Sequence, residues 1–196
     1  MPNRRALVVY DSKYGATEQI ANWITEGIND AEIQHIDDVT SLFYDLIVVG
    51  SPIYNDTPLI KVLEFLEKNK DNMSNKKVAL FTVSLPPEMT PDRAKRFVGK
   101  NQAKRLVEHT RGNIIDTKAF LGKIEIGELS QLDRLSLRIS YFIKGKKFKD
   151  VNFMNREEAV AWGRKLYDMM TKPAEVTPQQ PQETSKKTDL SSDFKK

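Results

Sequence analysis

The stretch ALVVYDSKYGATEQIA, residues 6–21, joins a short apolar run to the start of an amphipathic segment. The apolar part is typical of a buried strand, and Ile20, Ile24 and Ile28 then recur with helical spacing. A turn that only reverses the chain more often contains Asn-Gly, Asp-Gly or Pro. This turn instead contains several hydroxyl side chains and a single glycine, which predicts that it binds a ligand.

Short apolar runs alternate with segments of helical period along residues 6–170. The predicted strands are Ala6–Tyr10, Ile33–Ile36, Leu46–Val49, Val78–Val83 and Ile114–Ile126. Parallel strands need long crossover connections, which usually contain a helix and lie on the faces of the sheet. The alternation therefore predicts an α/β fold, a doubly wound five-stranded parallel sheet with helices on both faces.

Predicted helices fill the connections between these strands. Thr57 and Pro58 are suited to the N-cap and first position of the second helix, because proline has no N–H to leave unpaired there. Pro91 opens a third, more basic helix that ends near His109, and the last helix spans Arg156–Met170.

The predicted domain occupies residues 1–170. An insertion at 128–155, between the last strand and the last helix, is much longer than ordinary connections and has a helical pattern of its own. Residues 171–196 are rich in Pro, Gln, Ser, Thr and Lys and nearly free of large apolar side chains. We expect this tail to be disordered, since it cannot bury enough surface to offset its chain entropy.

The composition limits the possible chemistry. There is no cysteine, which excludes disulfides, thiolate catalysis and iron–sulfur ligation, so that redox chemistry requires a cofactor. The two histidines are far apart and lack metal-ligand spacing, and no catalytic nucleophile set is recognisable. The net charge of +4 favours acidic partners without requiring nucleic acid. The N-terminal apolar run is too short for a signal peptide, so a cytoplasmic protein is expected.

The first turn is suited to a phosphate. In open α/β sheets ligands bind beyond the carboxyl ends of the strands, where the hydroxyls of Ser12 and Thr17, backbone amides and a helix N-terminus would converge. A dinucleotide fold would need more glycines than Gly15, and a P-loop would need Gly-Lys-Ser or Gly-Lys-Thr, which does not occur. A phospho-receiver would need an acidic pair after the first strand and an Asp at the end of the third, but that strand ends Val48-Val49-Gly50-Ser51.

The run VVYDSKYGATEQIANWI, residues 8–24, resembles the FMN-phosphate signature of flavodoxins. The constrained positions of that signature are filled by Val8, Val9, Tyr10, Ser12, Gly15, Thr17, Ala21 and Ile24. The resemblance implies a flavodoxin-like sheet of strand order 2-1-3-4-5 and FMN as the cofactor. It also implies that the FMN phosphate is held by Ser12, Lys13, Tyr14, Gly15, Ala16 and Thr17.

Two later segments resemble the flavodoxin loops that flank the flavin ring, GSPIYNDTP (50–58) and SLPPEMTP (84–91). The residues implied are Ser51, Pro52, Ile53, Tyr54, Asn55 and Asp56 in the first loop, and Ser84, Leu85 and Pro86 in the second. Tyr54 is the only aromatic in either loop and is expected to stack on the ring. Asn55 stands where the family often has a glycine whose peptide flips. Asp56 adds charge near the ring or caps the second helix.

The resemblance implies an electron-transfer protein that shuttles electrons between redox partners. The alternative is a flavodoxin-fold oxidoreductase such as a quinone-dependent protoporphyrinogen oxidase, because the insertion with LDRLSLRISYFIKG (132–145) looks closest to that type. A third alternative is an interaction module in which FMN is structural. The sequence leaves these open.

The insertion is expected to form a helix with an apolar stripe of Leu132, Leu135, Ile139 and Phe142 and a second stripe of Leu137 and Tyr141. One alternative is a helix that packs on the domain. The other is an interaction surface for a second copy or an acidic redox partner, with peripheral membrane contact less favoured. The insertion is expected to lie apart from the cofactor site, so that deleting 129–149 would leave FMN binding intact.

Overall fold

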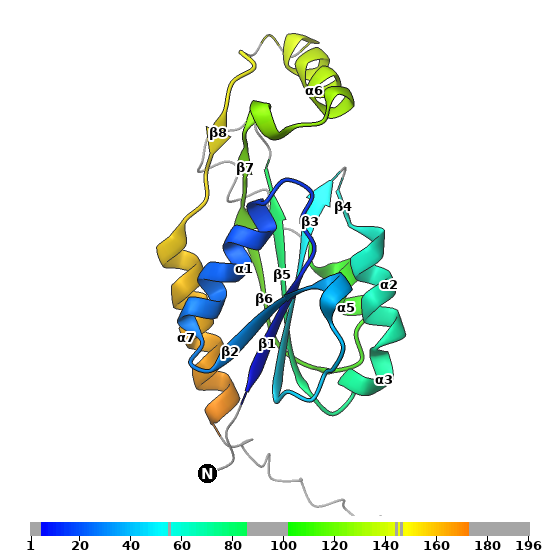
Figure 1. Ribbon diagram of the computed structural model, residues 1–196, viewed down its shortest axis with the longest axis vertical. Helices are drawn as coiled ribbons and strands as arrows, with labels where there is room; N and C mark the ends of the chain where they lie inside the picture. The colour runs from blue at the N-terminus through cyan, green and yellow to red at the C-terminus, as the bar shows by residue number, and fades with distance from the viewer. Residues whose placement is uncertain (1–4, 55, 86–101, 144, 146, 173–196) are drawn as a thin grey trace, which may run out of the picture.

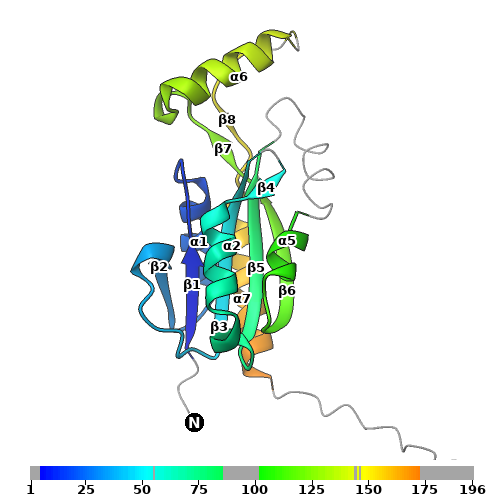
Figure 2. The same ribbon diagram turned by 90° about the vertical axis from the view of Figure 1, so that its right-hand side faces the viewer.

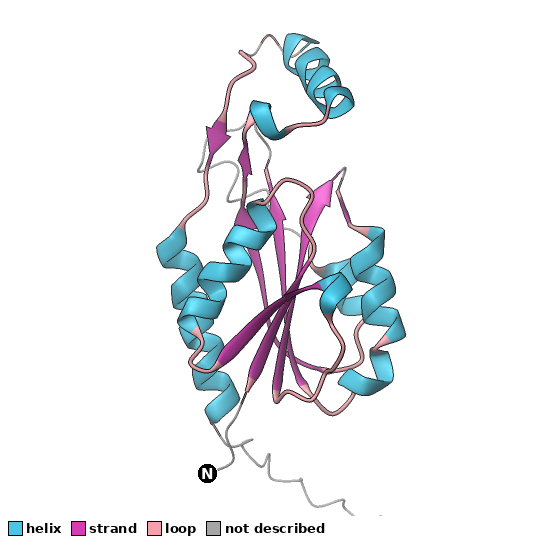
Figure 3. Cartoon of the chain, viewed as in Figure 1, coloured by secondary structure: helices cyan, strands magenta, loops and turns pink. Residues whose placement is uncertain are grey.

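The computed structural model describes residues 5–54, 56–85, 102–143, 145 and 147–172. Five parallel strands form the main sheet, and their spatial order confirms the predicted 2-1-3-4-5 arrangement (Figures 1 and 3). In that order they are β2 (Ala31–His35), β1 (Ala6–Tyr10), β3 (Leu46–Tyr54), β5 (Lys77–Ser84) and β6 (Asn113–Leu121). All four pairings between neighbours are parallel, so the carboxyl ends of these strands meet at one edge.

Helices cover both faces of the sheet (Figure 1). The helices α1 (Ala16–Gly27) and α7 (Arg156–Thr171) pack on one face, and α2 (Ile60–Lys68), α3 (Lys70–Met73) and α5 (Lys104–Glu108) on the other. Successive strand residues point to opposite faces, so Val8 belongs to the α1 and α7 core and Val9 to the α2 core. The doubly wound architecture expected from the sequence is thereby confirmed.

A pair of glycines brings α1 and α7 into close contact. A Cβ atom on Gly163 would meet the Ile24 carbonyl oxygen and the Cα of Gly27, and a Cβ on Gly27 would meet the backbone of α7. The two helices therefore pack backbone against backbone beside the core residue Trp162.

The region around Thr57 and Pro58 differs from the expectation. Strand β3 continues past Val49 to Tyr54 and turns back as β4 (Thr57–Pro58), which pairs with it antiparallel. Helix α2 begins two residues after Pro58, with Leu59 at the N-cap. The Ser51 hydroxyl accepts the Leu59 N–H at 3.0 Å and so anchors the chain just before α2, while no side chain of the described residues caps the first turn of this helix.

The insertion forms a ribbon and a helix beyond the carboxyl ends of the strands (Figures 1 and 2). The ribbon pairs β7 (Lys123–Ile124) with β8 (Val151–Asn152), and the short 3-10 helix η2 (Ile126–Glu128) precedes α6 (Gln131–Ile143). The helix expected within the insertion is thus present.

The two apolar stripes of α6 have different environments. Leu132, Leu135, Ile139 and Phe142 are 80, 56, 50 and 85% exposed. Tyr141, in contrast, is buried and lies edge-on to Phe148, with ring centroids 5.4 Å apart. The longer stripe therefore faces solvent, and the alternative in which this stripe packs on the domain is wrong.

Some expectations concern other parts of the chain. The start of the third predicted helix at Pro91 lies outside the described residues, and α5 forms its last part. The expected disordered tail falls almost entirely on residues 173–196, which also lie outside the described part. Within that described part, every helix is too short or too polar to cross a bilayer.

The glycine contact gives the first testable prediction. Gly163→Ala should lower the free energy of unfolding by about 1–3 kcal/mol, because the new methyl group overpacks the contact with α1. Ordinary helix propensity predicts the opposite sign, since alanine is about 1 kcal/mol more favourable than glycine in a helix. The measurement is urea unfolding, with Gly127→Ala, where a Cβ meets open space, as the control. A variant as stable as the parent chain would contradict the close packing.

Candidate functional site

A cavity of about 550 Å³ lies at the carboxyl edge of the sheet. Such a volume is within the usual range for small-molecule and cofactor sites. Ten of the fifteen residues implied by the sequence line it, namely Ser12, Lys13, Tyr14, Ala16, Thr17, Pro52, Ile53, Tyr54, Ser84 and Leu85. The structure thus brings together three segments that are far apart in the sequence.

The other five residues have different places. Gly15 does not line the cavity but has a φ of 75°, the left-handed conformation that lets the loop turn into α1. Ser51 is buried and holds the start of α2. Asp56 is exposed with a φ of 59°, and it does not cap α2, so the capping alternative is wrong. Asn55 and Pro86 lie outside the described residues.

Thr17 carries an unusual polar group in the first turn of α1. Its side chain is 1% exposed, and its hydroxyl oxygen has no hydrogen-bond partner among the described residues. A buried hydroxyl is normally paired, because leaving it unpaired costs free energy. Gly15 at the N-cap offers no side chain, and no other side chain of the described residues caps α1, so the hydroxyls of this turn do not serve as a helix cap.

The start of α1 therefore has free binding capacity for an anion. The helix N-terminus has a partial positive charge, and Thr17 adds a buried hydroxyl facing the same cavity. Lys13 lies in the same loop, but its ammonium donates to Asp133, so the backbone amides and the hydroxyls provide the free donors. The donor set fits a phosphate group.

Two aromatic rings border the other part of the cavity. Burial raises the pKa of Tyr54 to about 12, so its phenol stays neutral at physiological pH. Tyr14 lies edge-on to it, with ring centroids 6.4 Å apart, and the Lys13 ammonium lies 5.9 Å from the Tyr54 ring centroid. Together with the lining residues Pro52 and Ile53, this surface suits a flat aromatic ligand.

The insertion supplies a wall of the cavity, which sequence reasoning missed. The additional lining residues include Gly122, Lys123, Ile124 and Glu125 after β6, and Leu129, Asp133, Ser136 and Leu137 around α6. The expectation that the insertion lies apart from the site is therefore wrong. A usable signal was its position directly after the fifth strand, whose carboxyl end must lie at the ligand-binding edge.

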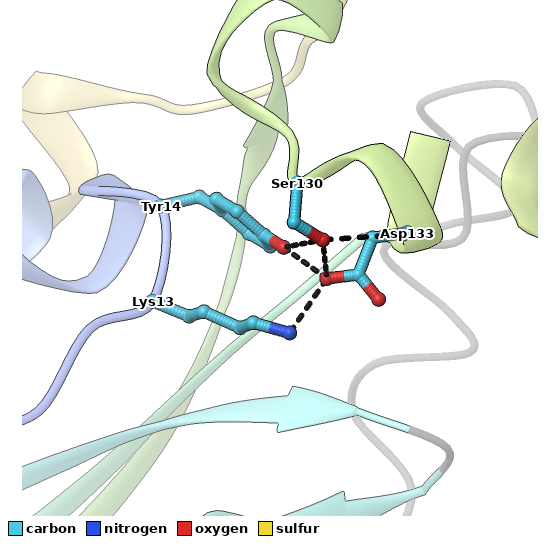
Figure 4. A network of polar contacts seen from close by, with 4 residues as sticks. All are labelled: Lys13, Tyr14, Ser130 and Asp133. Carbon is cyan, nitrogen blue, oxygen red and sulfur yellow. Dashed lines mark hydrogen bonds and ion pairs between the residues drawn. The ribbon is translucent and has the colours of Figure 1, made fainter. Parts of the chain in front are cut away.

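Asp133 joins this wall to the first loop (Figure 4). Its carboxylate accepts hydrogen bonds from the Lys13 ammonium at 2.6 Å, from the Tyr14 hydroxyl, and from the Ser130 hydroxyl at 3.0 Å. Hydrogen bonds from Lys13 and then Tyr14 lower the pKa of Asp133 to about 2. The carboxylate is thus ionised throughout the physiological range.

Comparison with known proteins gives an independent view of the fold and family. The flavodoxin domain family matches residues 7–150. A flavodoxin from the domain Archaea superposes with a TM-score of 0.54 at 17% identity, over 86% of this chain and 99% of that one. A flavodiiron protein from Giardia intestinalis gives a TM-score of 0.50 at 14% identity, over 85% of this chain and 36% of that one. No curated protein shows significant sequence similarity.

The unpaired hydroxyl gives a prediction for the ligand-free protein. Thr17→Val should raise the free energy of unfolding by about 1 kcal/mol, because an isosteric methyl group replaces a buried hydroxyl that lacks a partner. Thr25→Val on the same helix is the matched control, since the Thr25 hydroxyl donates to the Ala21 carbonyl at 2.9 Å. Denaturant unfolding of both variants checks this. Equal destabilisation by both substitutions would show that the Thr17 hydroxyl is satisfied without a ligand.

Proposed function

We propose that this chain, which belongs to the flavodoxin domain family, binds FMN and carries electrons between redox partners. The unpaired hydroxyl of Thr17 at the start of α1 is the single observation that carries the proposal. A phosphate there would accept a hydrogen bond from the Thr17 hydroxyl, whose burial otherwise costs free energy without a compensating hydrogen bond. The adjoining aromatic surface would take the flavin ring.

Different parts of the cavity have different roles in this proposal. Ser12–Thr17 hold the phosphate, while Pro52, Ile53 and Tyr54 border the ring on one side and Ser84 and Leu85 on another. FMN, when bound, supplies one- and two-electron transfer. The protein contributes binding, orientation and the polarity around the ring.

Tyr54 is proposed to set the potential of the flavin. Its neutral phenol presents an electron-rich face, which disfavours additional negative charge on a ring stacked against it. Lys13 acts in the opposite direction, but its charge is already compensated by Asp133. The balance lowers the potential of the bound flavin.

For the partner we propose an acidic redox protein that docks on the exposed apolar stripe of α6. Arg134 and Arg138 lie on the same helix, and the charge of Asp133 is compensated by Lys13. The helix therefore presents a net positive charge to a partner. A second copy would bring the same positive charge to the contact, which disfavours self-association. An acidic partner is attracted by it.

A second function is favoured by one observation, the wall that the insertion adds to the cavity. Leu129 is buried and Leu137 lines the cavity beside Asp133, so the site is more enclosed than a carrier with an exposed flavin edge requires. An enclosed site would suit an oxidoreductase acting on a planar substrate, such as a quinone-dependent protoporphyrinogen oxidase.

The protein should purify with, or take up, about one FMN per chain, and Tyr54→Leu should leave it bound through its phosphate. The midpoint potential should rise by roughly 20–60 mV, the equivalent of one aromatic contact for a one-electron couple. Potentiometric titration of the flavin absorbance measures this. Tyr54→Phe is the control, because it keeps the ring and should shift the potential less. An unchanged potential in the leucine variant would place the flavin ring elsewhere.

Substitutions on the two sides of α6 distinguish the two functions. For a carrier, Leu132→Ser with Phe142→Ser should slow electron transfer to an acidic probe such as a ferredoxin, and added salt should slow the parent chain too. Phe43→Ser, at another exposed apolar residue, is the control. For an oxidoreductase, Leu137→Ser should instead slow quinone-dependent porphyrinogen oxidation, with the outer variants unaffected. Stopped-flow measurement of both reactions decides between them.

A further inference from the structure

We propose that the insertion is a lid over the FMN site, and that the Asp133 carboxylate holds it closed against Lys13 and Tyr14 of the first loop. The proposal rests on the proposed binding of FMN and deepens it. It assigns Asp133 a positioning role, in which it acts on the ligand through the loop and the lid.

The lid is attached to the domain through a narrow ribbon. The strands β7 and β8 pair through two residues each, Lys123 with Asn152 and Ile124 with Val151. One further bond, from the Phe153 N–H to the Gly122 carbonyl at 3.1 Å, continues the ribbon toward the sheet. A short two-stranded ribbon is only marginally stable by itself. The position of α6 over the sheet therefore depends on contacts made by the helix.

The polar contacts of Asp133 provide that attachment (Figure 4). Lys13 and Tyr14 are 120 and 119 residues away in sequence, yet both donate to the same carboxylate oxygen. Ser130 fixes the carboxylate in turn, because its hydroxyl donates to that oxygen and accepts the Asp133 N–H at 3.2 Å. Ser130 thus holds the acceptor in place from within the insertion, through contacts that do not involve the first loop.

One cation of the first loop pairs with one carboxylate of α6. Lys13 is the only cation among residues 12–17, and Asp133 is the only acidic residue in α6. The side chains are 49 and 37% exposed, so solvent screens the pair and its strength is that of a surface network. Such a contact is suited to opening and closing.

The same residues connect the lid to the ligand. Ser136 and Leu137 of α6 line the cavity together with Thr17 and Tyr54. In this proposal α6 covers a flavin that fills the cavity, and release of the flavin requires the helix to move. Closure of the lid should therefore slow the dissociation of FMN more than it slows electron transfer by the bound FMN.

The test is the FMN dissociation rate in the full chain, followed as released FMN is captured by an excess of a tighter flavin-binding protein. Asp133→Asn should raise the rate roughly threefold or more, as expected for the loss of a surface network. Asp133→Glu should restore part of the difference. Glu128→Gln, which removes an exposed carboxylate from the same insertion, should leave the rate unchanged.

A double-variant cycle separates the lid from direct contacts of Tyr14 with FMN. Tyr14→Phe and Asp133→Asn should be non-additive, because each breaks the same contact. Slower release from Asp133→Asn would overturn the proposal, since it would mean that Asp133 only competes with the phosphate for Lys13. Additive effects, or a rate equal to that of the parent chain, would overturn it as well.

Hydrogen exchange in the FMN-free protein gives a readout that does not depend on the flavin. The amides of α6 should exchange several-fold faster in Asp133→Asn than in the parent chain, while those of α1 stay unchanged. Equal exchange in α6 would overturn the proposal. In a chain that binds no FMN the proposed function fails, and hydrogen exchange alone then decides whether Asp133 holds α6.

Discussion

The structure depends on a single local constraint, the left-handed turn at Gly15 that starts α1 without a side-chain cap. This turn places Thr17 in the first helical turn, at the edge where the parallel strands end, with its hydroxyl buried and without a partner in the described part of the chain. A chain that needed only a stable helix start would have used an Asn, Asp or Ser cap. The uncapped start is explained if a phosphate satisfies the same backbone and hydroxyl groups.

The two sides of the insertion have different environments. Its inner side adds Asp133 and Leu137 to the cavity, and its outer side leaves Leu132 and Phe142 exposed to solvent. A helix that buried its longer apolar stripe on the domain would have closed the outer side to partners. With Asp133 tied to the first loop, one helix both lines the cavity and keeps its longer apolar stripe exposed, which are the two features on which the proposed cofactor and partner binding rest.

Much of this architecture could be predicted from the sequence. The strand β1 is a clear apolar run, and the helix α7 has clear helical periodicity and an N-cap. The start of α2 could not, because Thr57 and Pro58 form a good local N-terminus but pair with β3 as β4, and Ser51 of β3 holds the Leu59 N–H instead. The orientation of α6 could not either. Periodicity assigns the longer apolar stripe to the interior, whereas the contact of Asp133 with Lys13 and Tyr14 orients the helix across about 120 residues of sequence.

The most direct test of the central claim is the phosphorus NMR spectrum of FMN bound to this chain, recorded as a function of pH. The account predicts a resonance distinct from that of free FMN that does not titrate between about pH 5 and 8, because amides and the Thr17 hydroxyl hold the dianion away from water. A phosphate that titrates near its ordinary pKa of about 6, or a chain that binds no FMN, would contradict it.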